Sequence, residues 1–121
     1  MFSALRSLFR TPATAEAKMA AKTFVVDTIK AEKVVVFSKT YCPYCVKAKK
    51  ALNQFTTKYA VIELDQRGDG DAIQDALLEV TGGRSVPRVF IGGTFIGGGD
   101  DTAAKAASGE LQGLLQAVGA L

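Results

Sequence analysis

Residues 34–45 read Val34-Val35-Val36-Phe37-Ser38-Lys39-Thr40-Tyr41-Cys42-Pro43-Tyr44-Cys45, an apolar run followed by a Cys-x-x-Cys motif. An unbroken β-branched run is typical of a strand buried on both faces. Pro43 favours the first position of a helix, because it lacks the amide hydrogen that would go unpaired there. Cys42 is therefore predicted to be the N-cap, where the first-turn amides and the helix dipole favour a negatively charged sulfur. A Cys-x-x-Cys at such a junction is typical of disulfide exchange.

The two sulfurs are predicted to have different roles. Cys42 lies at the mouth of the helix, and Lys39 adds positive charge on its approach side. Cys45 falls inside the first turn and faces the core, so we expect Cys42 to attack as the nucleophile and Cys45 to resolve the product. A structural zinc site is the alternative, but it would need two further Cys or His ligands, and the chain has two cysteines and no histidine. No metal is expected.

Length and charge narrow the class of protein. At 121 residues the chain is long enough for one domain with a core. The net charge of +3 comes from residues 1–22, which carry four basic side chains and one acidic one, so the rest of the chain is neutral. Neither a nucleic acid nor a membrane is expected as a partner, since the domain has no basic excess and no apolar run approaches about 18 residues.

The first twenty residues differ in composition from the rest. Arg6 and Arg10 precede the first acidic residue, Glu16, and Pro12 ends any short helix before it. This pattern resembles an organelle transit peptide, and a disordered tail is the alternative. We therefore divide the chain into a flexible N-terminal extension or transit peptide, residues 1–20, and a folded domain, residues 21–121.

Helical and strand patterns alternate along the domain. Strands are expected at 33–37, 59–64, 86–91 and 94–96, with a Gly92-Gly93 hairpin turn between the last two. Helices are expected up to about Glu32, from Pro43 to about Thr57, from the Gly68-Asp69-Gly70-Asp71 turn to Gly82 with Ile73, Leu77 and Val80 on the core side, and over 100–118 with a break near Gly109. This order predicts an α/β domain, a four-stranded mixed β-sheet flanked by helices on both faces.

Four segments in this order resemble the dithiol glutaredoxins with a Cys-Pro-Tyr-Cys active site. They are the active-site segment 38–45, the helix segment 71–74, the Val-Pro loop with its strand 85–90, and the Gly-Gly-aspartate segment 96–101. The resemblance covers roughly Ala21 to Leu121 and implies a thioredoxin-like fold. The Trp-Cys-Gly-Pro-Cys segment of thioredoxin itself has no counterpart here.

The resemblance also implies a groove for glutathione beside Cys42. Lys39 and Gln74 would hold its glycine carboxylate, and Asp100 and Asp101 would receive its γ-glutamyl end. The implied glutathione-binding residues are Lys39, Tyr44, Gln74, Val86, a cis Pro87, Gly99, Asp100 and Asp101. Gly99 departs from many relatives, which carry a polar residue or a cysteine at this position.

The function that follows is glutathione-dependent reduction of protein–glutathione mixed disulfides and protein disulfides, with glutathione as co-substrate. Disulfide-bonded or glutathionylated client proteins are the expected partners of a monomer. An iron–sulfur scaffold, in which Cys42 of two chains and two glutathiones hold a cluster, is the first alternative. The resemblance places cluster binding mainly in members with a small residue where this chain has Pro43.

A disulfide oxidant for folding proteins is the second alternative, but residues 1–20 do not form a secretory signal. We expect a cytoplasmic location. Import into a mitochondrion or plastid is the alternative if residues 1–20 act as a transit peptide, and Met19 offers a shorter start.

Overall fold

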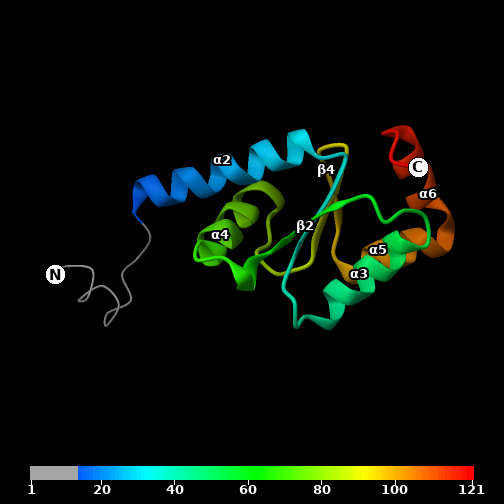
Figure 1. Cartoon of the computed structure of the whole chain (residues 1–121), viewed down its shortest axis with the longest axis horizontal. Coiled ribbons are helices and arrows are strands. Elements are labelled where there is room, and N and C mark those ends of the chain that lie inside the picture. The colour runs from blue at the N-terminus through cyan, green and yellow to red at the C-terminus, as the bar shows by residue number, and fades with distance from the viewer. Residues whose placement is uncertain (1–13) are drawn as a thin grey trace.

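The computed structural model describes residues 14–121. Figure 1 shows a sheet between two groups of helices. In chain order the elements are α2 (Ala15–Ala31), β1 (Val34–Ser38), α3 (Pro43–Asn53), β2 (Ala60–Glu63), the 3-10 turn η1 (Leu64–Gln66), α4 (Gly70–Thr81), β3 (Arg88–Ile91), β4 (Thr94–Gly97), α5 (Gly99–Ser108) and α6 (Glu110–Ala117).

The strands form one four-stranded sheet in the order β2-β1-β3-β4. The β1 strand pairs parallel with β2, with Ser38 opposite Glu63, and antiparallel with β3. A two-residue turn at Gly92 and Gly93, both with positive φ, joins β3 to β4. The predicted mixed sheet is confirmed, and the parallel pair brings the ends of β1 and β2 to one edge of the molecule.

The apolar run of β1 divides its side chains between two cores. Val35 and Phe37 pack with residues of α2 and α4, whereas Val34 and Val36 pack with residues of α3, α5 and α6. Successive side chains of a strand point to opposite faces, so a strand covered by helices on both faces must be apolar throughout. Figure 1 shows α2 and α4 on one side of the sheet and α3 and α5 on the other.

Several predicted helix bounds and one predicted core residue differ from the structure. The α2 helix begins at Ala15, inside the predicted extension, because Thr14 accepts a hydrogen bond from the Ala17 amide at 3.0 Å and caps it. Residues 1–13 of the predicted extension lie outside the described residues, so its role stays a prediction. The α3 helix ends at Asn53 rather than near Thr57. Val80, expected on the core side of α4, is 41% exposed.

The last two helices follow the prediction more closely. Gly109 has a φ of +86° and separates α5 from α6, so the expected break is confirmed. The β3 strand begins at Arg88 rather than at position 86, since Pro87 has no amide hydrogen to donate to a sheet. The Val86–Pro87 peptide bond is cis. No helix within residues 14–121 has both the length and the apolar character needed to cross a membrane.

Candidate functional site

Cys42 occupies the N-cap of α3, as predicted. Its backbone is extended, with φ −87° and ψ 118°, and its sulfur accepts a hydrogen bond from the Cys45 amide at 3.4 Å. The thiol is half-buried and faces the Val86 carbonyl oxygen at 3.8 Å. Cys42 is thus reachable from solvent while a first-turn amide points at its sulfur, the arrangement that stabilises a thiolate in a helix N-cap.

Cys45 lies one turn further along α3 and is fully buried. Burial is the main cause that raises the pKa of the Cys45 thiol, and its hydrogen bond with Cys42 acts in the same direction. The Lys39 amide opposes this shift, because it donates to the Cys45 sulfur at 3.5 Å and so favours the charged form. The two cysteines are not joined by a disulfide in this structure.

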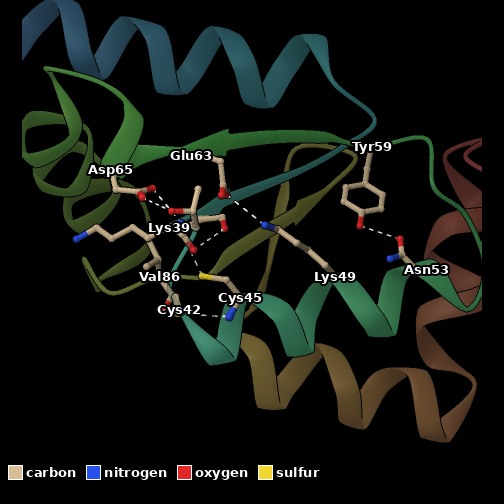
Figure 2. A network of polar contacts seen from close by, with 11 residues as sticks. Lys39, Cys42, Cys45, Lys49, Asn53, Tyr59, Glu63, Asp65 and Val86 are labelled. Atoms are coloured by element: carbon tan, nitrogen blue, oxygen red, sulfur yellow. Dashed lines mark hydrogen bonds and ion pairs between the residues drawn. The ribbon is translucent and has the colours of Figure 1, made fainter.

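The loop between β1 and α3 contacts both sulfur-bearing residues and is anchored to the end of β2. The Lys39 carbonyl accepts a hydrogen bond from the Cys42 amide at 3.2 Å. Asp65 accepts two hydrogen bonds from Thr40, one from its amide at 3.0 Å and one from its hydroxyl. These bonds from Thr40 hold the pKa of the Asp65 carboxyl below its usual range. Figure 2 shows Asp65 beside Lys39, with the two cysteines below them.

The residues of the predicted groove line two separate hollows. The first, named here the Lys39 pocket, has a volume of about 200 Å³ and lies between the Lys39 loop, η1 and the start of α4. Gln74, predicted as a ligand contact, lines it but is 95% buried and donates to the Arg84 carbonyl at 2.8 Å. One hydrogen of the Gln74 side-chain amide is therefore already used in a hydrogen bond within the protein. The lining residues are Lys39, Tyr41, Leu64, Asp65, Arg67, Gly68, Gly70, Asp71 and Gln74.

The second hollow, named here the α5 pocket, has a volume of about 490 Å³. It lies between the start of α3, the cis Val86–Pro87 loop and the N-terminus of α5. Six predicted residues line it, together with three that the sequence did not single out for this role: Tyr44, Ser85, Val86, Pro87, Arg88, Gly98, Gly99, Asp100 and Asp101. The structure thus places Lys39 and Gln74 in one pocket and the other six residues in the other.

The two aspartates of α5 have different partners. Asp101 accepts a hydrogen bond from the Gly98 amide at 3.1 Å, so it caps the helix. Asp100 instead forms an ion pair with Lys47 of α3, with the ammonium nitrogen 2.5 Å from a carboxylate oxygen. Both side chains of this pair are more than half exposed. Lys47 therefore occupies the position that was predicted for the ammonium of a ligand.

Gly99 lets α5 approach the first turn of α3. A Cβ atom placed on Gly99 would lie 2.5 Å from the carbonyl oxygen of Tyr44, closer than real Cβ atoms come to a neighbour. The neighbouring Gly98 has more room, since its Cβ would lie 3.5 Å from the Pro87 oxygen. In this chain the glycine at position 99 is therefore a packing requirement of the wall between Tyr44 and α5.

Sequence reasoning missed Asp65, Arg67 and Lys47. The signal for Asp65 was available, because it follows a strand parallel to β1, and such strands end at one edge of the sheet. Arg67 lines the Lys39 pocket but donates to both carboxylate oxygens of Asp69, at 2.8 and 3.1 Å. It also lies over the ring of Phe24, 4.3 Å from its centre. The guanidinium group of Arg67 is thus already engaged by Asp69 and Phe24.

Two further features lie outside this site. A wider hollow of about 570 Å³ runs along α2 between Glu16 and Thr28, away from both cysteines. Neither cysteine lines this hollow, and it is open to solvent, so it has no catalytic role in the site described above. Among residues 14–121, no group of three or more His, Cys, Asp or Glu side chains is placed to hold a metal ion.

Several known proteins resemble this chain in sequence and in fold. Residues 34–96 match the family model described as Glutaredoxin. A protein of Ricinus communis named glutaredoxin is 54% identical over 101 residues, which cover 84% of this chain and 99% of that protein.

Two solved structures extend the comparison. Oxidized glutaredoxin 2 of Chlamydomonas reinhardtii superposes with a TM-score of 0.84 at 63% identity, over 86% of this chain and 98% of that one. A buckwheat glutaredoxin–glutathione complex superposes with a TM-score of 0.85 at 47% identity, over 90% of this chain and 99% of that one.

Proposed function

The chain belongs to the glutaredoxin family, and from that premise we propose how its two sulfurs divide the reaction. It has a thioredoxin-like fold and is a glutathione-dependent thiol–disulfide oxidoreductase with glutathione as co-substrate. The observation that carries the proposal is the contrast in access between the half-buried Cys42 at the N-cap and the fully buried Cys45 one turn later. Only the first sulfur can meet a sulfur of another protein without a change in structure.

In the proposed monothiol route, the Cys42 thiolate attacks the glutathionyl sulfur of a protein–glutathione mixed disulfide. The bond between the client and glutathione breaks, and the client leaves as a thiolate that takes a proton from solvent. Cys42 now carries glutathione. A glutathione thiolate then attacks that glutathionyl sulfur, giving glutathione disulfide and restoring the Cys42 thiolate. Cys45 takes no part in this route.

In the proposed dithiol route, Cys42 attacks a protein disulfide and forms a mixed disulfide with the client. Cys45 loses its proton and attacks the Cys42 sulfur, so that a Cys42–Cys45 bond forms and the client thiolate leaves. Two glutathiones then reduce this bond and leave as glutathione disulfide. The short span between the residues supports the route, because the Cys45 amide already contacts the Cys42 sulfur at 3.4 Å.

We propose that one glutathione spans both pockets with its sulfur at Cys42. Its glycine carboxylate would lie by Lys39 and Gln74 in the Lys39 pocket. Its γ-glutamyl end would lie at Asp100 and Asp101, with Tyr44, the Val86–Pro87 backbone and Gly99 forming the wall of the α5 pocket. Charge supports this direction, because a carboxylate is attracted by a lysine and an ammonium by the aspartates.

Activity of two serine variants tests the division of roles. Cys45→Ser should retain reduction of a glutathionylated peptide, whereas Cys42→Ser should lose both reactions. Both variants are assayed with a glutathionylated peptide and with a protein disulfide, in the presence of glutathione and its reductase. Activity of Cys42→Ser toward the glutathionylated peptide would show that the roles are wrongly assigned.

We further propose a monomer in the cytoplasm, with mitochondrial or plastid import as the alternative for residues 1–20. The proposal on location rests on composition alone. Sequencing the N-terminus of the protein isolated from its source tests it, since a start beyond residue 20 would indicate cleavage and favour import.

A further inference from the structure

The Lys39 loop is the structural link between Cys42 and Cys45. The Lys39 amide donates to the Cys45 sulfur, and the Lys39 carbonyl accepts from the Cys42 amide. At the buried sulfur, this amide is the backbone group that works against the effect of burial on the pKa. Anything that fixes the position of Lys39 therefore acts on Cys45 directly.

Asp65 fixes this loop from across the sheet edge. Its two carboxylate oxygens accept from the amide and the hydroxyl of Thr40, the residue that follows Lys39. A carboxylate that accepts two such bonds restrains both the backbone and the side chain of its partner. In Figure 2 the carboxylate of Asp65 faces this loop on the side opposite the cysteines.

Asp65 itself is held by packed structure. It lies in η1, directly after Leu64, whose side chain is 98% buried. The first residue of α4, Gly70, approaches the Leu64 carbonyl so closely that a Cβ atom there would collide with it. The anchor is therefore rigid on the β2 side, and the loop is the part that would move if the bonds were lost.

Ligand binding does not account for an acid at this position. Asp65 lines the Lys39 pocket, where the proposed function places a carboxylate of glutathione. A negative charge there repels that group, so it can only weaken glutathione binding. Its hydrogen bonds to Thr40 supply the compensating role.

We propose that Asp65 is a positioning residue for the resolving sulfur: through Thr40 it holds the Lys39 amide against Cys45 in the geometry from which Cys45 attacks. The inference rests on the proposed dithiol route and deepens it. The affected step is closure, in which Cys45 attacks the Cys42 sulfur of the Cys42–glutathione disulfide. Cys45 loses its proton to solvent, the Cys42–Cys45 bond forms, the bond to glutathione breaks, and glutathione leaves as a thiolate.

The test measures closure separately from the first attack. Reduced protein is mixed with glutathione disulfide, quenched in acid at intervals, and weighed by mass spectrometry, which distinguishes reduced protein, the glutathione adduct and the closed disulfide. Asp65→Ala should slow conversion of adduct to closed disulfide about tenfold and should not slow formation of the adduct, because it removes a charge that repels the glutathione carboxylate. In the Cys45→Ser background, where closure does not occur, Asp65→Ala should likewise not slow adduct formation.

Matched variants separate the hydrogen bonds from the charge. Asp65→Asn keeps an acceptor for the Thr40 amide without the charge, so it should restore most of the closure rate. Asp71→Ala removes an acid from the same pocket without touching the loop, and it should change the KM for glutathione without slowing closure. Thr40→Val removes only the hydroxyl bond and should slow closure by a smaller factor than Asp65→Ala, and Thr40→Ser should restore it.

The outcomes distinguish the inference from the function on which it rests. If the wild-type adduct closes, and folded Asp65→Ala and Thr40→Val close as fast as the wild type, the role of Asp65 is overturned and the dithiol route stands. Equal slowing of adduct formation and closure would also overturn it, since that would indicate a general structural role. If Asp65→Ala does not fold, Thr40→Val decides by itself. A wild-type adduct that never closes would overturn both the inference and the dithiol route.

Discussion

The two pockets that contain the predicted binding residues are built in different ways. The Lys39 pocket is small and lies among chain segments that are tied to each other: Asp65 to Thr40, Arg67 to Asp69, and Gln74 to the Arg84 carbonyl. The α5 pocket is more than twice as large, and its acids lie at an exposed helix start, where Asp100 forms an ion pair with the exposed Lys47.

This difference indicates that the Lys39 pocket presents a fixed arrangement to a ligand, whereas the α5 pocket can exchange one partner for another. On the first side Asp65, Arg67 and Gln74 have partners within the protein, so a ligand meets a largely fixed arrangement. Lys39 is the cation of this pocket that forms no ion pair among residues 14–121. On the second side the ligand must replace an existing partner, Lys47, before it reaches Asp100. We therefore expect changes near Lys39 to have large effects on binding and changes near Asp100 to have small ones.

The largest effect is expected at Lys39. Lys39→Met keeps most of the side-chain length and removes the charge that we propose for the glycine carboxylate. Loss of a charge-assisted hydrogen bond should raise the KM for glutathione and for a glutathionylated peptide about tenfold or more, with a smaller change in kcat. Steady-state kinetics measure this.

Lys50→Met is the matched control, because Lys50 is exposed on α3 and forms no ion pair among the described residues. Equal KM values for the two variants would mean that Lys39 does not bind the ligand.

A loss of stability of intermediate size is expected at Gly99, where the wall of the α5 pocket is closely packed. Gly99→Ala places a methyl group against the Tyr44 carbonyl and forces α3 and α5 apart, which should lower the free energy of unfolding by about 1–3 kcal/mol. Gly98→Ala adds the same methyl group in ordinary contact with the Pro87 oxygen and should cost less. Urea denaturation compares the two. If Gly99→Ala were as stable as Gly98→Ala, the close approach would not constrain this wall.

The smallest effect is expected at Lys47, and it should be a gain. Lys47→Gln frees Asp100 from its ion pair, so the ammonium of glutathione no longer competes with a protein cation. Exposed ion pairs are weak, and the KM for glutathione should fall only about two- to threefold. Added salt should weaken the same pair and reduce the difference between variant and wild type. A higher KM in Lys47→Gln, with Lys50→Gln unchanged, would show that Lys47 binds the ligand instead of excluding it.

Much of this arrangement could be predicted from the sequence because it depends on local rules. The apolar run of β1 predicts a strand covered on both faces, and Pro43 after Cys42 predicts the helix start that presents the thiol. Gly109 predicts the break between the last helices. Each of these follows from the conformational preferences of a few neighbouring residues.

Other features could not be predicted because they depend on contacts between distant segments. The first turn of α2 has no apolar periodicity, so only its cap at Thr14 could mark the start at Ala15. Val80 follows the helical period of the core but lies on an exposed part of α4. Asp65 meets Thr40 through the parallel pairing of β1 and β2, and Asp100 meets Lys47 across two helices. The position of Asp65 after its strand could have been noted from the sequence, but neither of these two pairings could.

One measurement tests the central claim that a single glutathione spans both pockets from the sulfur of Cys42. Cys45→Ser protein is labelled with ¹⁵N, converted to its glutathione mixed disulfide, and compared with the reduced protein by NMR. The account predicts shifts in the Gln74 side-chain amide in the Lys39 pocket and in the Gly98 and Gly99 amides in the α5 pocket, with the amide of Gly109 unchanged. Shifts confined to one pocket, or glutathione found on no cysteine, would contradict it.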